Sequence, residues 1–209
     1  MEWIYNNYIE VLGAVAGLIY LYLEIKQNIW LWPLGIVTSA FYIYVFFTSK
    51  FYADMGLQVY YLVISIYGWW HWLYGGDPIN KIELPITRTS LKQWINIGLI
   101  TLVLFIVMVF VLKKFTDSPV PVGDAFVTAL SITGTWMLAR KLIEHWWIWV
   151  VVNIVSLGLF IWKDLYPTSV LYFFYFTMAI VGYYQWRKEM GRQRIEEREE
   201  NEIKVLINQ

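Results

Sequence analysis

Phe51-Tyr-Ala-Asp-Met-Gly-Leu-Gln-Val-Tyr-Tyr61, followed by Gly68-Trp-Trp-His-Trp72, recurs 114 positions later as Leu165-Tyr-Pro-Thr-Ser-Val-Leu-Tyr-Phe-Phe-Tyr175 and Gly182-Tyr-Tyr-Gln-Trp186. The matched pairs are Tyr52/Tyr166, Leu57/Leu171, Tyr61/Tyr175, Ile66/Ile180, Gly68/Gly182 and Trp72/Trp186, and the register extends back through Trp32/Trp146 to Lys26/Arg140. Because almost every residue inside the repeat is apolar, the pattern predicts a membrane protein built from two copies of a helical unit, with a ligand site between them. Such an architecture is typical of transporters.

The composition supports a membrane location. Hydrophobic residues make up 59% of the chain, aromatic residues 20% and charged residues 15%, which leaves too little polar surface for a soluble globule. A bilayer core of about 30 Å takes about 20 helical residues to cross. Seven stretches approach this length: 8–25, 30–48, 54–74, 94–113, 122–140, 146–162 and 166–186. We therefore expect an all-α integral membrane protein with seven transmembrane helices.

The repeat predicts how these seven helices are organised. Residues 1–75 form a first three-helix repeat, residues 122–186 a second one, and residues 187–209 a charged tail. Two copies with three spans each would be antiparallel unless one further helix restored the orientation. The region 76–121 supplies this linker helix at about 94–113, whose smooth apolar run suits a position against lipid. The expected arrangement is thus two parallel repeats joined by a linker helix, three plus one plus three.

The basic residues predict the orientation in the membrane. One side receives four of them, Lys50, Lys113, Lys114 and Lys163. The other side receives twelve, Lys26, Lys81, Arg88, Lys92, Arg140, Lys141, Arg187, Lys188, Arg192, Arg194, Arg198 and Lys204. We therefore expect a cytoplasmic carboxyl terminus, with the tail as a solvated helix, and an external amino terminus. No cleavable signal peptide is visible, so the first span should be retained.

Polar side chains inside spans normally face the bundle interior and often line a pathway. At about 100° per residue, several of them share helical faces. These stripes are Asp54, Gln58, Tyr61 and Ser65 in the third span, Thr168, Tyr172, Tyr175 and Ala179 in the seventh, and Asp124, Thr128, Ser131 and Thr135 in the fifth. In the sixth span, Trp146, Trp149 and Asn153 share one face, where two indoles could grip a flat or cationic ligand and the amide could bind its edge. Their counterparts in the second span are Trp32, Gly35 and Ser39.

Other readings apply to some of these residues. Tryptophans near span ends are commonly interfacial anchors, and we assign Trp30, Trp69, Trp70, Trp72, Trp147 and Trp186 to this class. Asp54 can equally cap the amino terminus of the third span. Gly13, Gly17, Gly68 and Gly182 are interpreted as points of close helix packing. His71 and His145 lack metal-ligand spacing and are interpreted as interfacial polar residues.

Five motifs in order resemble the PnuC family of bacterial vitamin transporters. They are Trp32-Pro-Leu-Gly-Ile, Tyr52-Ala-Asp-Met-Gly-Leu-Gln58, Tyr67-Gly-Trp-Trp-His-Trp72, Trp146-Trp-Ile-Trp-Val-Val-Val-Asn153 and Leu165-Tyr-Pro-Thr-Ser-Val-Leu-Tyr172, and they cover roughly residues 10–186. The resemblance implies a fold similar to that of SWEET sugar transporters, a trimeric assembly and energy-independent facilitated uptake across the bacterial inner membrane. It also implies that the Trp-x-x-Trp-x-x-x-Asn stretch, here Trp146, Trp149 and Asn153, contributes to the substrate pocket.

The substrate implied by the resemblance is a vitamin. Nicotinamide riboside is favoured over thiamine, because the riboside hydroxyls need more hydrogen-bond partners than a thiazolium does. An acidic side chain, Asp54 or Asp124, would suit either cation. The complete set of candidate substrate-binding residues is Trp146, Trp149, Asn153, Gln58, Asp54, Tyr61, Tyr172, Tyr175, Asp124 and Thr128. No metal, cofactor or nucleic-acid partner is expected.

Other function classes have less support. A retinal protein would need a lysine deep in a span, and a channel would need charged rings or carbonyl filters; the sequence has neither. A non-transport membrane sensor or enzyme remains an alternative, although we expect no enzymatic activity. Since there is no Gly-Lys-Ser/Thr phosphate loop, we expect transport without ATP.

Overall fold

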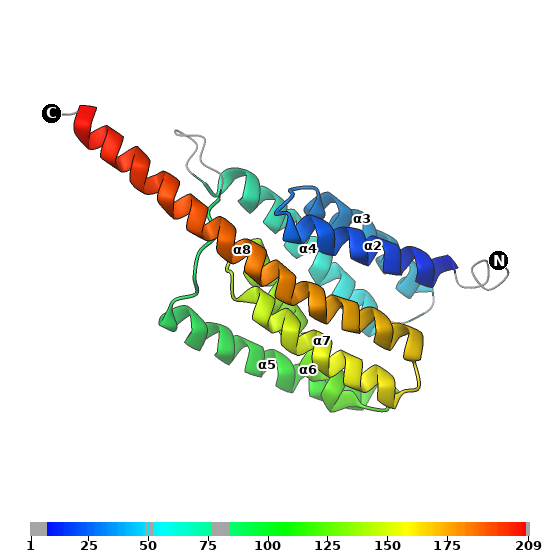
Figure 1. Ribbon diagram of the computed structural model, residues 1–209. Coiled ribbons are helices and arrows are strands. Elements are labelled where there is room, and N and C mark those ends of the chain that lie inside the picture. Colours follow the sequence, from blue (N-terminus) through cyan, green and yellow to red (C-terminus); the bar gives the residue numbers. More distant parts are fainter. Residues whose placement is uncertain (1–7, 49, 51, 77–83, 208–209) are drawn as a thin grey trace.

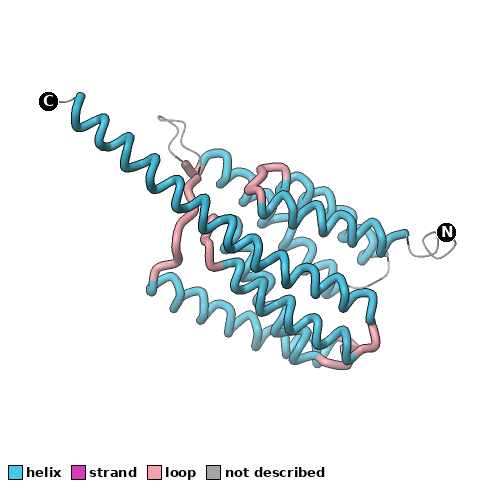
Figure 2. The backbone as a smooth tube through the Cα atoms, viewed as in Figure 1, coloured by secondary structure: helices cyan, strands magenta, loops and turns pink. Residues whose placement is uncertain are grey.

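The computed structural model describes residues 8–48, 50, 52–76 and 84–207. This part of the chain forms seven helices (Figures 1 and 2). They are α2 (Tyr8–Ile25), α3 (Leu31–Thr48), α4 (Tyr52–Tyr74), α5 (Leu91–Phe115), α6 (Pro121–Ala139), α7 (His145–Trp162) and α8 (Tyr166–Ile207). The all-helical prediction is confirmed, and the seven predicted stretches each match one helix.

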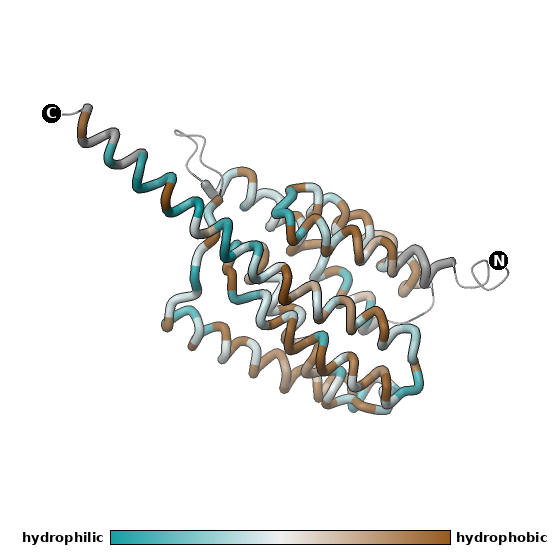
Figure 3. The backbone as a smooth tube through the Cα atoms, in the orientation of Figure 1, coloured by the Kyte–Doolittle hydropathy of each residue, from teal (hydrophilic) through white to brown (hydrophobic). Residues whose placement is uncertain are grey.

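Four of these helices, α3, α5, α6 and α7, are long and apolar enough to cross a membrane. Within α2, the described segment Ala14–Ile25 is also apolar but shorter. Helix α4 is rich in tyrosine and tryptophan, and the second half of α8 is charged. The bundle is brown over most of its length in Figure 3, whereas the protruding half of α8 is mostly teal. Large apolar side chains that are exposed in the isolated chain, such as Val37, Val63 and Val103, are those that a lipid environment would cover.

Local sequence explains where two helices begin. Ser90 is the N-cap of α5: its hydroxyl oxygen accepts from the Gln93 backbone N–H at 3.4 Å, and the Ser90 backbone N–H donates to the Gln93 side chain at 2.8 Å. This reciprocal pair is a capping box. Helix α6 begins with Pro121, whose fixed φ suits a first helical position. The capping box fixes the start of α5, and Pro121 fixes the end of the short connection between α5 and α6.

Each helix contact in the first half of the chain has a counterpart in the second. Helix α3 packs along α4, and α7 packs along α8. Helix α2 contacts α3, and α6 contacts α7. Across the two halves, α4 contacts α6 and α8 contacts α2. Helix α5 packs against α6, and of its residues Ile97 is the one classed as buried, which agrees with the expected position against lipid.

The turns between helices also match. Gln27 and Lys141, which are counterparts in the repeat, both have positive φ angles, 53° and 49°. The next residue in each turn donates to a carbonyl five residues back: Asn28 N to Leu23 O at 2.8 Å, and Leu142 N to Met137 O at 3.0 Å. Helices α2 and α6 therefore end in the same geometry.

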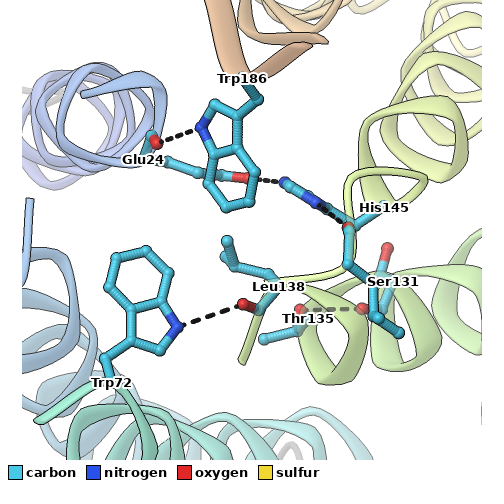
Figure 4. A network of polar contacts seen from close by, with 8 residues as sticks. Glu24, Trp72, Ser131, Thr135, Leu138, His145 and Trp186 are labelled. Carbon is cyan, nitrogen blue, oxygen red and sulfur yellow. Dashed lines mark hydrogen bonds and ion pairs between the residues drawn. The ribbon is translucent and has the colours of Figure 1, made fainter. Parts of the chain in front are cut away.

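Two buried tryptophan pairs fill one end of the bundle. This end, at which α2, α4 and α6 finish, is called the tail end below. Trp32 meets Trp72 edge to face at a centroid distance of 5.4 Å, and Trp146 meets Trp186 at 5.8 Å. The indole N–H of Trp72 donates to Leu138 O at 3.3 Å (Figure 4). Trp72 and Trp186 are only 6% and 0% exposed, so their assignment as interfacial anchors was wrong. Both belong to the core because they face the other half of the bundle.

The four remaining tryptophans assigned as anchors, Trp30, Trp69, Trp70 and Trp147, are exposed as expected. Of the glycines interpreted as packing points, Gly17, Gly68 and Gly182 lie against the side chains of Tyr175, Trp32 and Trp146 respectively. Gly13 belongs to a part of α2 whose side-chain surroundings lie outside the described ones.

A segment before α5 covers the tail end. Thr87 forms a short parallel bridge with the turn between α6 and α7, donating to Lys141 O at 3.1 Å and accepting from Ile143 N at 3.0 Å. Leu84 and Ile86 of this segment are buried in the same core cluster as the tryptophans. Ile86 N also donates to the Gln193 side chain in the first turns of the tail, at 3.1 Å. The tail end is thus closed by packed side chains.

Helix α8 runs through the bundle and continues as the tail without a break, over 42 residues (Figure 1). Beyond Met190, its side chains are mostly exposed and charged. The side chain of Arg192 bridges Glu189 and Glu196, and these carboxylates raise the pKa of the Arg192 guanidinium. The sequence expectation of a solvated helical tail agrees with this segment.

Candidate functional site

A cavity of about 400 Å³ lies at the centre of the bundle. Its walls come from six helices, α2, α3 and α4 on one side and α6, α7 and α8 on the other. This volume falls within the range of small-molecule sites. The cavity lies where the repeat predicted a ligand site, between the two halves of the chain.

Seven of the ten candidate residues line this cavity. They are Gln58, Tyr61, Trp146, Trp149, Asn153, Tyr172 and Tyr175. They come from α4, α7 and α8, so residues far apart in the sequence meet around one space. Their role in binding a substrate remains a prediction.

Trp146 and Trp149 form the aromatic part of the wall. Trp146 is fully buried, and its ring is fixed against Gly182 and between the rings of His145 and Trp186. Trp149 is partly buried one turn further along α7. The Nε1–H groups of both indoles are buried and have no hydrogen-bond partner among the described residues. The Nε1–H group of Trp32, the counterpart of Trp146 in the first half, is buried and without a described partner in the same way.

Asn153 and the tyrosines form the polar part. Asn153 is 6% exposed, so its carboxamide sits in the interior and can exchange hydrogen bonds with a molecule in the cavity. Tyr172 and Tyr175 meet edge to face at a centroid distance of 5.6 Å. The Tyr175 hydroxyl lies where a side chain at position 17 would be, so Gly17 makes room for it. The cavity therefore offers both flat aromatic surfaces and hydrogen-bonding groups.

Three candidates lie elsewhere. Asp54, Asp124 and Thr128 line a larger groove of about 1610 Å³ between α4, α5 and α6. The Asp124 carboxylate accepts from the Ser118 hydroxyl at 2.6 Å and from Lys163 Nζ at 3.2 Å. These partners account for the charge of Asp124 without a ligand. The sequence spacing predicts which residues of a helix share one face. It does not predict which neighbouring helix packs against each end of that face.

Several cavity residues were not chosen from the sequence. Ser65, Ser131 and Thr135 belonged to the polar stripes, and Ser39 is the counterpart of Asn153. All four lie on helical faces that the sequence already indicated. Including every polar residue on these faces would have added them to the candidate substrate-binding residues. Tyr20, Thr38 and Tyr42 also line the cavity, and no stripe pointed to them.

Glu24 and His145 form a buried hydrogen-bonded contact between two ionisable side chains, which the sequence interpretation missed. His145 Nε2 lies 3.2 Å from Glu24 Oε1, with the side chains 0% and 4% exposed (Figure 4). His145 Nδ1 lies 2.7 Å from Leu142 O, and the Trp186 indole donates to Glu24 O at 3.0 Å. The interpretation of His145 as an interfacial residue was therefore wrong, because the fold buries it between α2 and α8. Glu24 is the sole charged residue among those that line the central cavity in the described part of the chain.

The repeat contained a signal for this pair. The counterpart of Glu24 is Leu138, and the counterpart of His145 is Leu31. Glu24 in the first half and His145 in the second thus each stand at a position where the other half has a buried leucine. Such an exchange inside an apolar repeat indicates a local function, because buried charge is costly in a membrane.

Comparison with known proteins agrees with this architecture. The family model described as nicotinamide mononucleotide transporter matches residues 7–188. The nicotinamide riboside transporter PnuC of Escherichia coli is 26% identical over 204 residues, covering 86% of this chain and 85% of the relative. The riboflavin/roseoflavin transporter RibM of Streptomyces davaonensis is 23% identical over 181 residues, covering 85% of this chain and 83% of the relative.

The fold has a counterpart among solved structures. The crystal structure of the vitamin B3 transporter PnuC superposes with a TM-score of 0.69 at 23% identity, covering 89% of this chain and 83% of the other. At this identity the likeness concerns the fold. The family match covers most of the chain and confirms the resemblance found in the sequence motifs. The chain belongs to the PnuC-type nicotinamide mononucleotide transporter family of membrane transporters.

Proposed function

We propose that this protein transports nicotinamide riboside across the bacterial inner membrane by facilitated diffusion, with the central cavity as the substrate site. The observation that carries the proposal is the alignment of Trp146, Trp149 and Asn153 on the wall of the central cavity. A planar pyridinium can stack on the indoles. The E. coli relative, named a nicotinamide riboside transporter, points to the same substrate.

The polar lining favours a riboside over a thiazolium. Ribose hydroxyls need several donors and acceptors, and Gln58, Tyr61 and Asn153 are joined in the cavity by serine and threonine hydroxyls. Thiamine, as a cation, shares the aromatic requirement but uses fewer of these groups. It remains the alternative substrate within the same family.

Direct binding to the purified protein tests the substrate. We expect nicotinamide riboside to bind at least about tenfold more tightly than thiamine or riboflavin, equivalent to about 1.4 kcal/mol. Isothermal titration with the three vitamins side by side measures this. Tighter binding of thiamine would select the alternative, and tighter binding of riboflavin would place the protein nearer the function for which RibM is named.

The proposed mechanism is alternating access between two parallel three-helix repeats, α2–α4 and α6–α8, joined by the linker helix α5. The paired helix contacts and the matched turns at Gln27 and Lys141 support this arrangement of three plus one plus three. A cavity between two rigid repeats can open to either side when one rocks against the other. Residues 1–75, 76–121 and 122–186 would then act as first repeat, connection and second repeat.

Transport is proposed to be passive. Purified protein in liposomes should equilibrate labelled nicotinamide riboside without ATP or an imposed ion gradient. Accumulation that collapses when a proton or sodium gradient is dissipated would contradict this. Asp54 and Asp124 would then be the first residues to examine as coupling groups.

The proposed orientation has the amino terminus outside and the carboxyl terminus in the cytoplasm. It rests on the distribution of Lys and Arg, with twelve of sixteen on the tail side. A reporter active only in the cytoplasm should work when fused after Gln209 and fail when fused before Met1. Activity at both ends would mean an even number of spans and would contradict the repeat model.

A homotrimer is proposed by family resemblance. Native mass spectrometry of the detergent-solubilised protein should give three times the chain mass of 24.9 kDa. A monomeric mass in several mild detergents would contradict the trimer without affecting the proposed substrate.

A further inference from the structure

We propose that Glu24 is the counter-charge for a cationic substrate in the central cavity, and that His145 positions it. The inference rests on the proposed function, because it names the group that would make this site select a positively charged ligand. The sequence had pointed to Asp54 or Asp124 for this role, but both line the groove at α5. Glu24 instead lines the cavity itself.

The burial of Glu24 calls for a cause. Its side chain is 4% exposed in the last turns of α2, among core residues such as Trp186. A carboxylate in such surroundings persists only if other groups compensate its charge. The corresponding position in the second half of the chain is Leu138, which packs there without any such need. The carboxylate is therefore not required by the helix packing.

His145 is the hydrogen-bond partner of the Glu24 carboxyl group, and it does not itself line the cavity. The ring contacts Glu24 through Nε2, and Leu142 O through Nδ1, and it is fully buried. Since a carbonyl oxygen only accepts, Nδ1 carries a proton. The 3.2 Å contact between His145 Nε2 and Glu24 Oε1 needs one further proton to be a hydrogen bond. This proton sits on the His145 nitrogen or on the Glu24 oxygen. In both placements the pair as a whole is neutral, and Glu24 is the member of the pair that lines the cavity, whereas His145 does not.

This arrangement can respond to a cation without net proton exchange. A positive charge in the cavity favours the placement with the proton on Nε2, because the oxygen end is then a full carboxylate. The proton moves from the Glu24 oxygen to the His145 nitrogen, so no proton leaves the protein. The charge of the imidazolium lies behind the carboxylate, farther from the ligand. A neutral ligand gains nothing from this shift.

The other ionisable groups at this end have different surroundings. On α2, Tyr20 lines the cavity one turn before Glu24, and Lys26 is exposed. Lys141, in the turn before α7, places Nζ 4.5 Å from the centre of the Trp72 ring. Glu144 accepts from the Thr89 backbone and hydroxyl at 2.9 and 2.8 Å.

On α4, His71 stacks on Tyr67. On α8, Arg187 and Lys188 are exposed. Of these groups, Tyr20 alone shares the cavity with Glu24, and it carries no charge as a phenol.

The test compares two ligands of the same shape. One is nicotinamide riboside, and the other is its benzamide analogue, in which carbon replaces the ring nitrogen and removes the positive charge. Dissociation constants are measured by isothermal titration for the wild-type protein, Glu24→Gln, His145→Gln and Glu144→Gln. The wild type should prefer the cation. In Glu24→Gln this preference should fall by roughly 10- to 150-fold, as expected for the loss of one charge-assisted contact.

The other variants separate charge from structure. The benzamide analogue should bind Glu24→Gln within about threefold of the wild type, which also shows that the variant is folded. In His145→Gln the carboxamide can still donate to Glu24, so the preference for the cation should persist. Glu144→Gln, a matched change at a carboxylate outside the cavity, should keep the wild-type preference.

Three results would overturn the inference. These are an undiminished cation preference in Glu24→Gln, its loss in Glu144→Gln to the same degree, and its disappearance in a folded His145→Gln that still binds the benzamide analogue. If Glu24→Gln does not fold, Glu24→Asp decides: it keeps the charge but shortens the side chain, so the cation preference should weaken, and an unchanged preference would overturn the inference. Failure of the wild type to bind either ligand would instead contradict the proposed function, and with it this inference.

Discussion

The two halves of the bundle have the same scaffold but different chemistry. In both, a tryptophan at the start of the second helix packs on a glycine in the third, Trp32 on Gly68 and Trp146 on Gly182. One and two helical turns further along, the first half has Gly35 and Ser39 where the second has Trp149 and Asn153. Packing is thus repeated, whereas the groups offered to a ligand are not. An asymmetric ligand needs this, since a symmetric cavity could not distinguish its two ends.

The largest effect is expected from filling the matched glycines. Gly182→Ala would place a methyl group against the Trp146 ring closer than real atoms approach, and Gly68→Ala would do the same at Trp32. Overpacking of this kind costs about 1–3 kcal/mol of stability in each case. Because Trp146 lines the cavity and Trp32 does not, Gly182→Ala should also lose affinity for nicotinamide riboside.

Thermal unfolding in detergent and isothermal titration measure the two effects. As a control, Gly182→Ala combined with Trp146→Phe should recover part of the stability, because the smaller ring leaves space for the methyl group. Equal losses of affinity at both glycines would mean that the two halves contribute equally to binding, against the comparison above.

The next effect concerns Trp149 on the cavity wall, whose counterpart in the first half is Gly35. Trp149→Ala should lose stacking and cation attraction, about 1–3 kcal/mol, or roughly 5- to 150-fold in affinity. The control is Trp147→Ala. This neighbour is 49% exposed and packs on Tyr183 at 4.9 Å, away from the cavity, so affinity should remain nearly unchanged even if expression falls. Comparable losses in two folded variants would place the site on other helices.

A smaller effect distinguishes the counterparts Asn153 and Ser39, both of which line the cavity. Asn153→Ala should cost about 1–3 kcal/mol in binding, because it removes a buried hydrogen-bonding group. Ser39→Ala removes a single hydroxyl and should cost about 0.5–1.5 kcal/mol. Competition binding with labelled nicotinamide riboside resolves the difference. A larger loss at Ser39 would reverse the assignment of the polar end of the cavity to the second half.

The fold was predictable because its determinants are local and repeated. Apolar stretches of about 20 residues identify membrane helices one at a time, and the 114-residue register aligned Trp32 with Trp146 before any contact was known. Spacing also brought Gln58, Tyr61 and Asn153 to the correct helical faces. What spacing cannot give is the partner of a side chain. Glu24 and His145 are 121 residues apart, and each stands near a span end, where polar residues ordinarily meet the interface.

The last difference between the halves lies after their third helices: α4 ends at Tyr74, whereas α8 continues to Ile207. Met190 is buried in the core cluster, and the Gln193 side chain accepts from Ile86 N, so the first turns of the tail help to close the tail end. Arg192 and Glu196 form an exposed ion pair on the same segment, a kind of contact that contributes little. A chain ending at Ile195 should therefore bind nicotinamide riboside within about twofold of the full-length protein. A chain ending at Lys188, which lacks Met190 and Gln193, should instead unfold at a lower temperature in detergent. If the chain that ends at Ile195 already binds less tightly, the distal tail contributes to binding. The first half has no such segment, so the difference between the halves would then extend beyond the cavity.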